Sequence, residues 1–306
     1  MNLNNESSPN TIATWTSLVP MKMGLASSSV YAVMQAVQDI ILSMGSRINF
    51  ECVASVNIRD ILIKADSHEN ANRTFRVGSM DRTTVAKGGI CETTTSPKGD
   101  SWRNIRGHDW FIENHTVVAL RPDGEFHNAP ELLGNRLKDK SLGKLFIPKL
   151  SALSKRCAKA IEGERSEEYI DCLRQYYEVM LAWAQDTMLT QDVAEARDAL
   201  VKRLGKRVAV SQCGAGCSDS MVIAVEKDCL KEVKSYLKLN DWIIISCSPT
   251  SGLRMDFEPI AKELKISAPA RVPLIGAADL APNYGMAGTT LAVAIEPRNT
   301  LTIRPF

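Results

Sequence analysis

The sequence lacks long apolar runs, paired cysteines and any large excess of charge of one sign. No stretch approaches the roughly 20 apolar residues that a membrane-spanning helix needs, and the first ten residues are polar, without the apolar segment of a secretory signal. The 37 basic and 35 acidic residues nearly balance, so the composition gives no electrostatic reason to expect nucleic acid or an anionic membrane as partner. We therefore expect a cytoplasmic protein, and a small anionic ligand is compatible with its charge.

Metal-ligand spacings are lacking as well. The eight cysteines are scattered without CxxC pairs, which fits reduced core thiols better than a disulfide framework or a zinc cage. Cys213 and Cys217 stand four positions apart, a spacing that by itself supports a metal site only weakly. The four histidines show no ligand spacing either, so we expect them to be structural or exposed rather than catalytic.

What is present is an alternation of helical and strand-like segments in a chain long enough to bury a substantial core. From Leu25 to about Ser43, apolar residues recur every three to four positions, which predicts a buried helix that begins at a run of three serines. Further helices are predicted at 59–72, through most of 146–204 and at 229–237. Strand-like runs lie at 89–95, 115–120, 207–211, 221–225, 242–247, 291–295 and 300–303. These elements predict an α+β fold.

The serine run belongs to a segment, Gly24-Leu25-Ala26-Ser27-Ser28-Ser29, with the composition that phosphate binding requires. Small residues let a ligand approach the backbone, and the amides and dipole at a helix N-terminus favour negative charge. Serine at a helix start is commonly only an N-cap, so this segment does not establish a phosphate site on its own.

The segment 20–29 resembles the second motif of the galactokinase, homoserine kinase, mevalonate kinase and phosphomevalonate kinase superfamily, the GHMP kinases, typically P-x-x-x-G-L-G-S-S-A. Ala26 stands where that family usually has Gly, and Ser29 where Ala is usual. The resemblance implies that this segment binds the phosphates of ATP. The implied nucleotide-binding residues here are Lys22, Gly24, Leu25, Ala26, Ser27, Ser28 and Ser29.

A second match covers 68–82, followed by Gly88-Gly89, and is similar to the family's A-E-N…G-x-x-D-Q…G-G region. It implies that Asp81 is the catalytic aspartate and that Glu69, together with Ser28, binds Mg²⁺. Without the flanking pattern, a turn or cap residue is the preferred interpretation of Asp81.

Two further segments resemble the family's third motif and its closing strand. Cys213-Gly214-Ala215-Gly216-Cys217-Ser218-Asp219 looks like the Gly-rich loop, in which Gly214 and Gly216 are implied to support the phosphate site. Asp219 resembles the G-G-D ending of phosphomevalonate kinases. Thr250-Ser251-Gly252-Leu253-Arg254 looks like the closing strand of sugar-type members, although any turn has a similar composition.

The C-terminal segment 268–288 resembles the family's first, substrate-facing motif, with a D-L-x-P-x-Y…G spacing most similar to heptose-phosphate kinases and fucokinases. The resemblance implies that Arg271, Asp279 and Tyr284 face the acceptor substrate. The alternative interpretation of Arg271 and Asp279 is a surface ion pair and a turn residue, which the motif context makes the less favoured of the two.

The motifs recover the family order only when 267–306 is placed before 12–257, so the chain reads as circularly permuted, by nature or by engineering. Because permutation requires neighbouring termini, we expect both chain ends at one sheet edge. We expect two lobes, 1–130 plus 258–306 and 131–257, with the active site between them. The family's adenine-holding stretch before the phosphate loop is much reduced here.

The resemblance implies an ATP- and Mg²⁺-dependent kinase that phosphorylates a hydroxyl group of a sugar or sugar phosphate. Asp219 keeps a phosphomevalonate- or mevalonate-type alcohol as an alternative acceptor. A catalytically silent, ligand-sensing regulator of the same fold is the alternative from another functional class.

Overall fold

Two antiparallel sheets carry the fold in the computed structural model, which describes residues 11–18, 25–44, 50–71, 76–105, 109–121, 129–184, 189–214 and 218–305. The larger sheet has the order β3-β2-β10-β9-β8, with β1 also paired to β10, and the smaller has the order β5-β6-β4-β7. The strands of the larger sheet are β1 (Thr11–Thr16), β2 (Ile90–Thr95), β3 (Ser101–Ile105), β8 (Arg254–Glu258), β9 (Glu263–Ile275) and β10 (Gly288–Pro305). Those of the smaller are β4 (Thr116–Leu120), β5 (Val208–Gln212), β6 (Ser220–Val225) and β7 (Ile243–Ser246).

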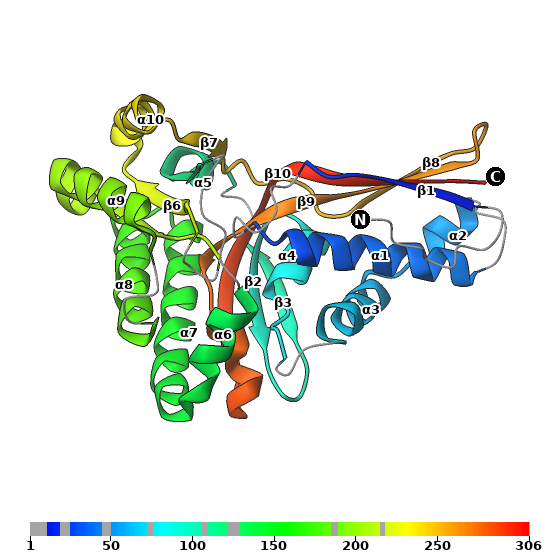
Figure 1. Cartoon of the computed structure of the whole chain (residues 1–306), viewed down its shortest axis with the longest axis horizontal. Helices are drawn as coiled ribbons and strands as arrows, with labels where there is room; N and C mark the ends of the chain where they lie inside the picture. The colour runs from blue at the N-terminus through cyan, green and yellow to red at the C-terminus, as the bar shows by residue number, and fades with distance from the viewer. Residues whose placement is uncertain are drawn as a thin grey trace.

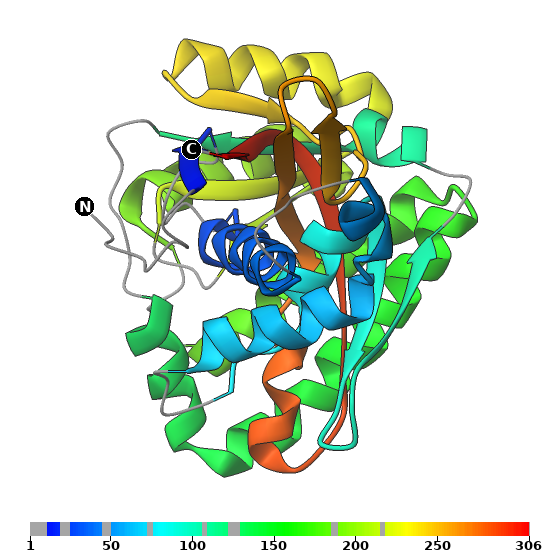
Figure 2. The same ribbon diagram turned by 90° about the vertical axis from the view of Figure 1, so that its right-hand side faces the viewer.

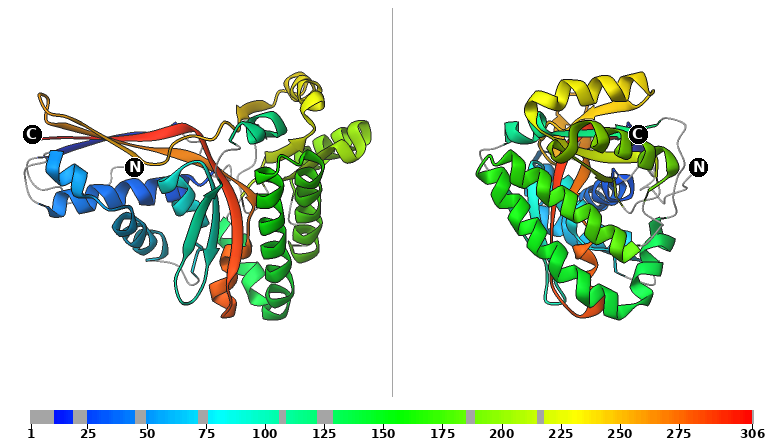
Figure 3. Two further views of the ribbon diagram at one scale, coloured as in Figure 1. Left: turned by 180° about the vertical axis from the view of Figure 1, so that it is seen from behind. Right: turned by 90° about the vertical axis from the view of Figure 1, so that its left-hand side faces the viewer.

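Helices pack at both ends of the long strands β9 and β10 (Figure 1). One group lies under the larger sheet: α1 (Ser27–Ser43), α2 (Phe50–Ser55), α3 (Ile58–Asn70) and α4 (Met80–Lys87). The other helices are α5 (Asp109–His115), α6 (Ala129–Lys138), α7 (Lys140–Glu162), α8 (Ser166–Ala184), α9 (Gln191–Leu204) and α10 (Leu230–Leu239). Figure 2 looks nearly along α1 with α3 beside it, and Figure 3 shows α7 and α8 packed side by side. The predicted α+β class is confirmed.

The predicted buried helix begins at the serine run, as expected, because its apolar positions form one stripe. Val30, Val33, Val37 and Ile41 are buried against the larger sheet, in a cluster that includes residues of β9 and β10. Burial of such a stripe, more than intrinsic helix propensity, stabilises a helix of this length.

The C-terminal strand differs from its prediction. The runs 291–295 and 300–303, expected to be separate, form the single strand β10. Its register with β9 shifts between Ile295 and Arg298. Pro297 falls in this shift, where its missing N–H removes no regular ladder hydrogen bond, so the strand continues through the proline.

Both ends of the described chain meet at one place in the larger sheet. Thr11 of β1 is the antiparallel partner of Pro305 of β10, and the pairing continues to Thr16 opposite Thr300. Figure 1 shows these two segments running together at the right-hand end of the sheet. The expected adjacency of the ends is confirmed for Thr11 and Pro305.

Strand β4 pairs with β6 and β7, although the predicted lobe division assigns 116–120 to the other lobe from these strands. All five of its residues are buried. A strand buried on both faces suits the interior of a sheet, with partners on both edges, and this requirement overrides its position in the sequence. The two-lobe division itself stays a prediction.

The described cysteines fit the expectation of core thiols. Six of them are buried and form no disulfide: Cys91, Cys157, Cys172, Cys213, Cys229 and Cys247. His115 is buried and its Nδ1 lies 2.9 Å from the carbonyl oxygen of Val225, a structural role. Among the helices that the structure describes, none combines the length and apolar character needed to cross a membrane.

Candidate functional site

The first turn of α1 is shaped by a left-handed residue. Ala26, immediately before the helix, has φ 60° and ψ 33°. Glycine adopts this conformation without strain, whereas an L-residue pays roughly 1–2 kcal/mol, which accounts for the glycine usual at this position in the matched motif. Because Ala26 occupies the N-cap and makes no side-chain hydrogen bond, the interpretation of the serines as a simple N-cap is wrong. The predicted residues Lys22 and Gly24 lie outside the described residues.

The three serines differ in exposure. Ser28 is exposed and Ser27 half-buried, while Ser29 is fully buried and donates its hydroxyl to Oε1 of Glu69 at 2.7 Å. Ser28 Oγ lies 3.4 Å from the same oxygen. The helix start is therefore solvent-accessible at Ser27 and Ser28 and is anchored to the interior through Ser29.

Asp81 and Arg271 form an ion pair between Asp81 Oδ1 and an Nη atom of Arg271. Asp81 lies in the first turn of α4 and Arg271 on β9, and their side chains are 17% and 5% exposed. The backbone N–H of Arg271 also donates to the carbonyl oxygen of Leu25, at 3.3 Å. The predicted convergence of the C-terminal segment with Asp81 and the helix start is thus confirmed, and the alternative of a surface ion pair is wrong.

Asp279 completes the acidic side of this cluster. It lies on the 3-10 helix η4 (Ala278–Tyr284) and is buried. Burial, followed by the nearby charge of Asp81, raises its pKa to about 7, while the guanidinium of Arg271 opposes the rise. The chain at Gly78 passes against it so closely that a Cβ built at Gly78 would stand 2.2 Å from the Cβ of Asp279. The Gly of the matched G-x-x-D pattern is therefore a packing requirement at this contact.

Two neighbours of the ion pair had no role in the kinase site that the sequence predicted. Burial raises the pKa of Cys213 to about 12, while the charge of Arg271 lowers this pKa and that of Asp81 raises it. The Cys213 side chain is therefore a neutral thiol near neutral pH. Tyr176, on α8, accepts a hydrogen bond from Gln212 Nε2 at 3.1 Å and interacts electrostatically with Asp279 and Arg271. Tyr176 belongs to none of the matched motifs, and in the sequence it is one of many apolar positions of a predicted helix.

Other predicted residues are placed differently. The hydroxyl of Tyr284 donates to the backbone oxygen of Arg136 at 3.0 Å, and its ring packs against Gly143. These are packing contacts, so a role at the substrate stays a prediction. Gly214 follows Cys213 with φ 67°, a left-handed conformation suited to glycine, and Gly216 lies outside the described residues. Asp219 accepts a hydrogen bond from Thr190 Oγ1.

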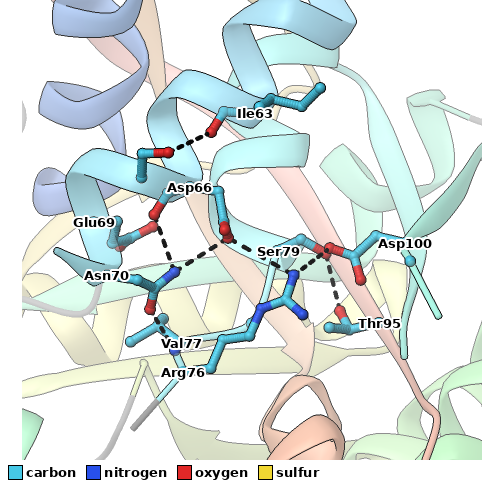
Figure 4. A network of polar contacts seen from close by, with 12 residues as sticks. Ile63, Asp66, Glu69, Asn70, Arg76, Val77, Ser79, Thr95 and Asp100 are labelled. Atoms are coloured by element: carbon cyan, nitrogen blue, oxygen red, sulfur yellow. Dashed lines mark hydrogen bonds and ion pairs between the residues drawn. The ribbon is translucent and has the colours of Figure 1, made fainter. Parts of the chain in front are cut away.

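The connection between α3 and α4 is held by a polar network (Figure 4). Asn70 accepts from the backbone N–H of Val77 at 2.8 Å and donates to Asp66. Arg76 lies between the carboxylates of Asp66 and Asp100, at 3.9 and 3.7 Å. These contacts orient the start of α4 and therefore Asp81.

The short segment around Gly252 is also more than a turn. A Cβ there would stand 2.3 Å from the carbonyl oxygen of Ala86, and one at Gly88 would stand 2.0 Å from the backbone nitrogen of Gly252. The two glycines let the chain after α4 cross the segment before β8 in backbone contact, with Leu253 N–H donating to Ala86 at 3.1 Å.

Comparison with solved structures identifies the fold. Galactokinase from Lactococcus lactis in complex with galactose matches with a TM-score of 0.53 and 13% identity over 76% of this chain and 68% of that chain. A mevalonate kinase matches with a TM-score of 0.53 and 16% identity over 75% and 66% of the two chains. Mevalonate diphosphate decarboxylase from Staphylococcus aureus matches with a TM-score of 0.51 and 16% identity over 76% and 68%.

The fold resembles that of the GHMP kinases. No model of a protein family matches the sequence, and no curated protein matches it either. At 10–16% identity the GHMP-like structures establish the fold alone, and the reaction has to be argued from the site.

The donor set predicted for Mg²⁺ is Ser28 and Glu69, and these residues do lie together. Both carboxylate oxygens of Glu69 are nevertheless engaged, Oε1 by the two serines and Oε2 by Arg82 Nη1 at 3.2 Å. A carboxylate that binds a metal offers an oxygen to the ion, and here the buried guanidinium of Arg82 already occupies the Oε2 side of Glu69. This arrangement does not fit a magnesium ion held by Glu69.

Proposed function

We propose that the protein is an ATP-dependent small-molecule kinase that transfers the γ-phosphoryl group to a hydroxyl of a sugar or sugar phosphate. The observation that carries this proposal is the ion pair between Asp81 and the buried Arg271, which lies beside the start of α1. At this place three segments that are distant in the sequence bring together a carboxylate, a cation and a helix N-terminus. Phosphoryl transfer requires such positioning and charge stabilisation more than covalent chemistry by the protein.

In this proposal the amides at Ser27 and Ser28, with their hydroxyls, bind the phosphates of ATP. The acceptor oxygen forms a bond to the γ-phosphorus while the bond to the β,γ-bridging oxygen breaks, and ADP leaves with that electron pair. Asp81 orients the acceptor hydroxyl and takes its proton. Arg271 holds Asp81 in place and balances its charge.

The side chains near Asp81 support a hydrophilic acceptor. The carboxyl group of Asp279 and the phenol of Tyr176 interact electrostatically with Arg271, and the amide of Gln212 donates to Tyr176 at 3.1 Å. A sugar needs several such donors and acceptors, whereas a mevalonate-type acceptor suits a more apolar pocket with a single carboxylate-binding cation. We therefore favour the sugar class over the phosphomevalonate class, in line with the heptose-phosphate-kinase-like spacing of 279–288.

We also propose that the chain is a circular permutant of the family arrangement. The pairing of Thr11 with Pro305 supports it, because a short connection at that point would restore the usual motif order. In the proposed division, the lobes 1–130 plus 258–306 and 131–257 face each other across the site.

The test is release of ADP by the purified protein, given ATP and magnesium with a panel of free sugars, sugar phosphates, mevalonate and phosphomevalonate. We expect ADP release above background with at least one sugar or sugar phosphate. If ADP were released only with mevalonate or phosphomevalonate, the acceptor would belong to the mevalonate-type class instead of the sugar class. Saturable ATP binding without release in any mixture would favour the silent regulator.

A further inference from the structure

Arg82, the residue after Asp81, is among the most deeply buried charged side chains of the described chain, at 2% exposure. Its Nη1 donates to Glu69 Oε2 at 3.2 Å and to the carbonyl oxygen of Gly78 at 3.0 Å, and its Nη2 pairs with Asp66. The side chain of Glu69 is itself only 3% exposed. A fully buried cation thus stands directly against the carboxylate predicted to bind metal.

The opposite side of Glu69 contacts the serines. A chain of contacts runs from Arg82 through Glu69 to Ser29, at 3.2 and 2.7 Å, and reaches Ser28 at 3.4 Å. The guanidinium and the first turn of α1 are therefore joined by one carboxylate. In a buried setting such charge-assisted hydrogen bonds fix geometry strongly, since neither partner exchanges its contacts for water.

We propose that Arg82 is the resident cation of this site: it takes the place of a protein-held metal at Glu69, and Glu69 positions Ser28 and Ser29 instead of binding Mg²⁺. Any divalent ion then enters only on the phosphates of the nucleotide. The part of this proposal that concerns nucleotide rests on the proposed kinase function. The part that concerns Glu69 rests on the contacts alone.

Electrostatics supports the presence of Arg82 in place of a metal ion at Glu69. A magnesium ion lies about 2.0–2.1 Å from a carboxylate oxygen, so an ion on Oε2 of Glu69 would stand at most about 5.3 Å from Arg82 Nη1, which lies 3.2 Å from that oxygen. Two like charges at that separation repel strongly in a buried environment, where water does not screen them. Arg82 is also held by Gly78 and Asp66, so a movement away from Glu69 would break these contacts as well.

The test is Mn²⁺ binding, followed by electron paramagnetic resonance, to the full chain without nucleotide. We expect wild type and Glu69→Gln to bind Mn²⁺ equally weakly. Arg82→Gln keeps a polar side chain without the charge and should gain a Mn²⁺ site at least about tenfold tighter. That site should be absent from the double variant Arg82→Gln/Glu69→Gln.

Arg76→Gln is the matched control, because it removes a cation from the same α3–α4 connection that contacts Asp66 and not Glu69 in the contacts described. It should gain no Mn²⁺ site. Circular dichroism establishes that each variant is folded, and if Arg82→Gln does not fold, the comparison of wild type with Glu69→Gln decides.

A Mn²⁺ site in wild type that Glu69→Gln abolishes would overturn the proposal, as would a folded Arg82→Gln variant without any Glu69-dependent site. Neither result depends on turnover. The kinase proposal fails in the ADP assay instead, so the two failures are distinguishable.

Discussion

Two buried arginines stand beside carboxylates in this molecule, with opposite consequences. Arg82 lies between Glu69 and Asp66, and hydroxyls of Ser28 and Ser29 supply Glu69 with further hydrogen bonds. Arg271 pairs with Asp81, while burial and the nearby charge of Asp81 raise the pKa of the neighbouring Asp279 to about 7. Carboxylates supplied with donors are stable structural anchors, whereas a crowded acidic pair retains a group that titrates near neutrality. We call the cluster around Arg82 the anchoring cluster and the cluster around Arg271, where we propose that the reaction occurs, the reactive cluster.

Asp81→Asn tests the reactive cluster. We expect turnover to fall about 10²- to 10⁴-fold, because the amide no longer takes the acceptor's proton, while ATP binding changes little. Steady-state ADP release and nucleotide titration measure the two effects. Glu162→Gln, which removes a carboxylate that pairs with the exposed Arg103 outside both clusters, is the control and should leave turnover within a few-fold of wild type. Unchanged turnover in Asp81→Asn would remove Asp81 from the catalytic role.

Arg82→Leu tests the anchoring cluster through stability. Removing one partner of a buried ion pair leaves Glu69 uncompensated, so we expect a loss of about 3–5 kcal/mol in the free energy of unfolding. Denaturant titration measures it. Arg103→Leu removes an exposed arginine that pairs with Glu92 and Glu162, and should cost about 0–1 kcal/mol. Equal losses in the two variants would contradict the distinction.

The pKa of Asp279 predicts a pH dependence of stability. The carboxyl titrates near 3.8 when unfolded and near 7 when folded, so between these values the unfolded chain binds fewer protons than the folded one. Stability from this group is therefore present below about pH 4 and lost as the pH rises to about 7, by on the order of 4 kcal/mol. The free energy of unfolding of wild type minus that of Asp279→Asn should decrease across this window. A flat difference would contradict the raised pKa.

Gly78→Ala tests the packing against Asp279. The added methyl group would overlap Asp279, so the chain or the carboxylate has to shift, at about 1–3 kcal/mol. We also expect a weaker apparent affinity for the acceptor, with ATP affinity unchanged. Gly163→Ala is the control and should cost less, because its Cβ would stand 3.1 Å from the flexible side chain of Arg165 and 3.2 Å from the carbonyl oxygen of Lys159, both much longer than the 2.2 Å contact at Gly78.

Local patterns carried a large part of the prediction. The periodic valines of α1 predicted both the helix and its start at Ser27, because one helical face had to be buried. The matched segments also predicted that Arg271 and Asp81 converge, which the ion pair confirms. Local patterns did not give the partners of a strand: the sequence predicted β4 as a strand, and only its pairing with β6 and β7 assigns it to the smaller sheet.

The sequence by itself determined the elements and the inventory of charged side chains that meet at the site, because periodicity and turn chemistry act over a few residues. The tertiary structure decided which charges neutralise one another. Asp81 and Arg82 are neighbours in the chain, yet on helix α4 Asp81 pairs with Arg271 and Arg82 pairs with Glu69. Charge pairing depends on distance and burial in three dimensions, and adjacent residues of a helix point in different directions.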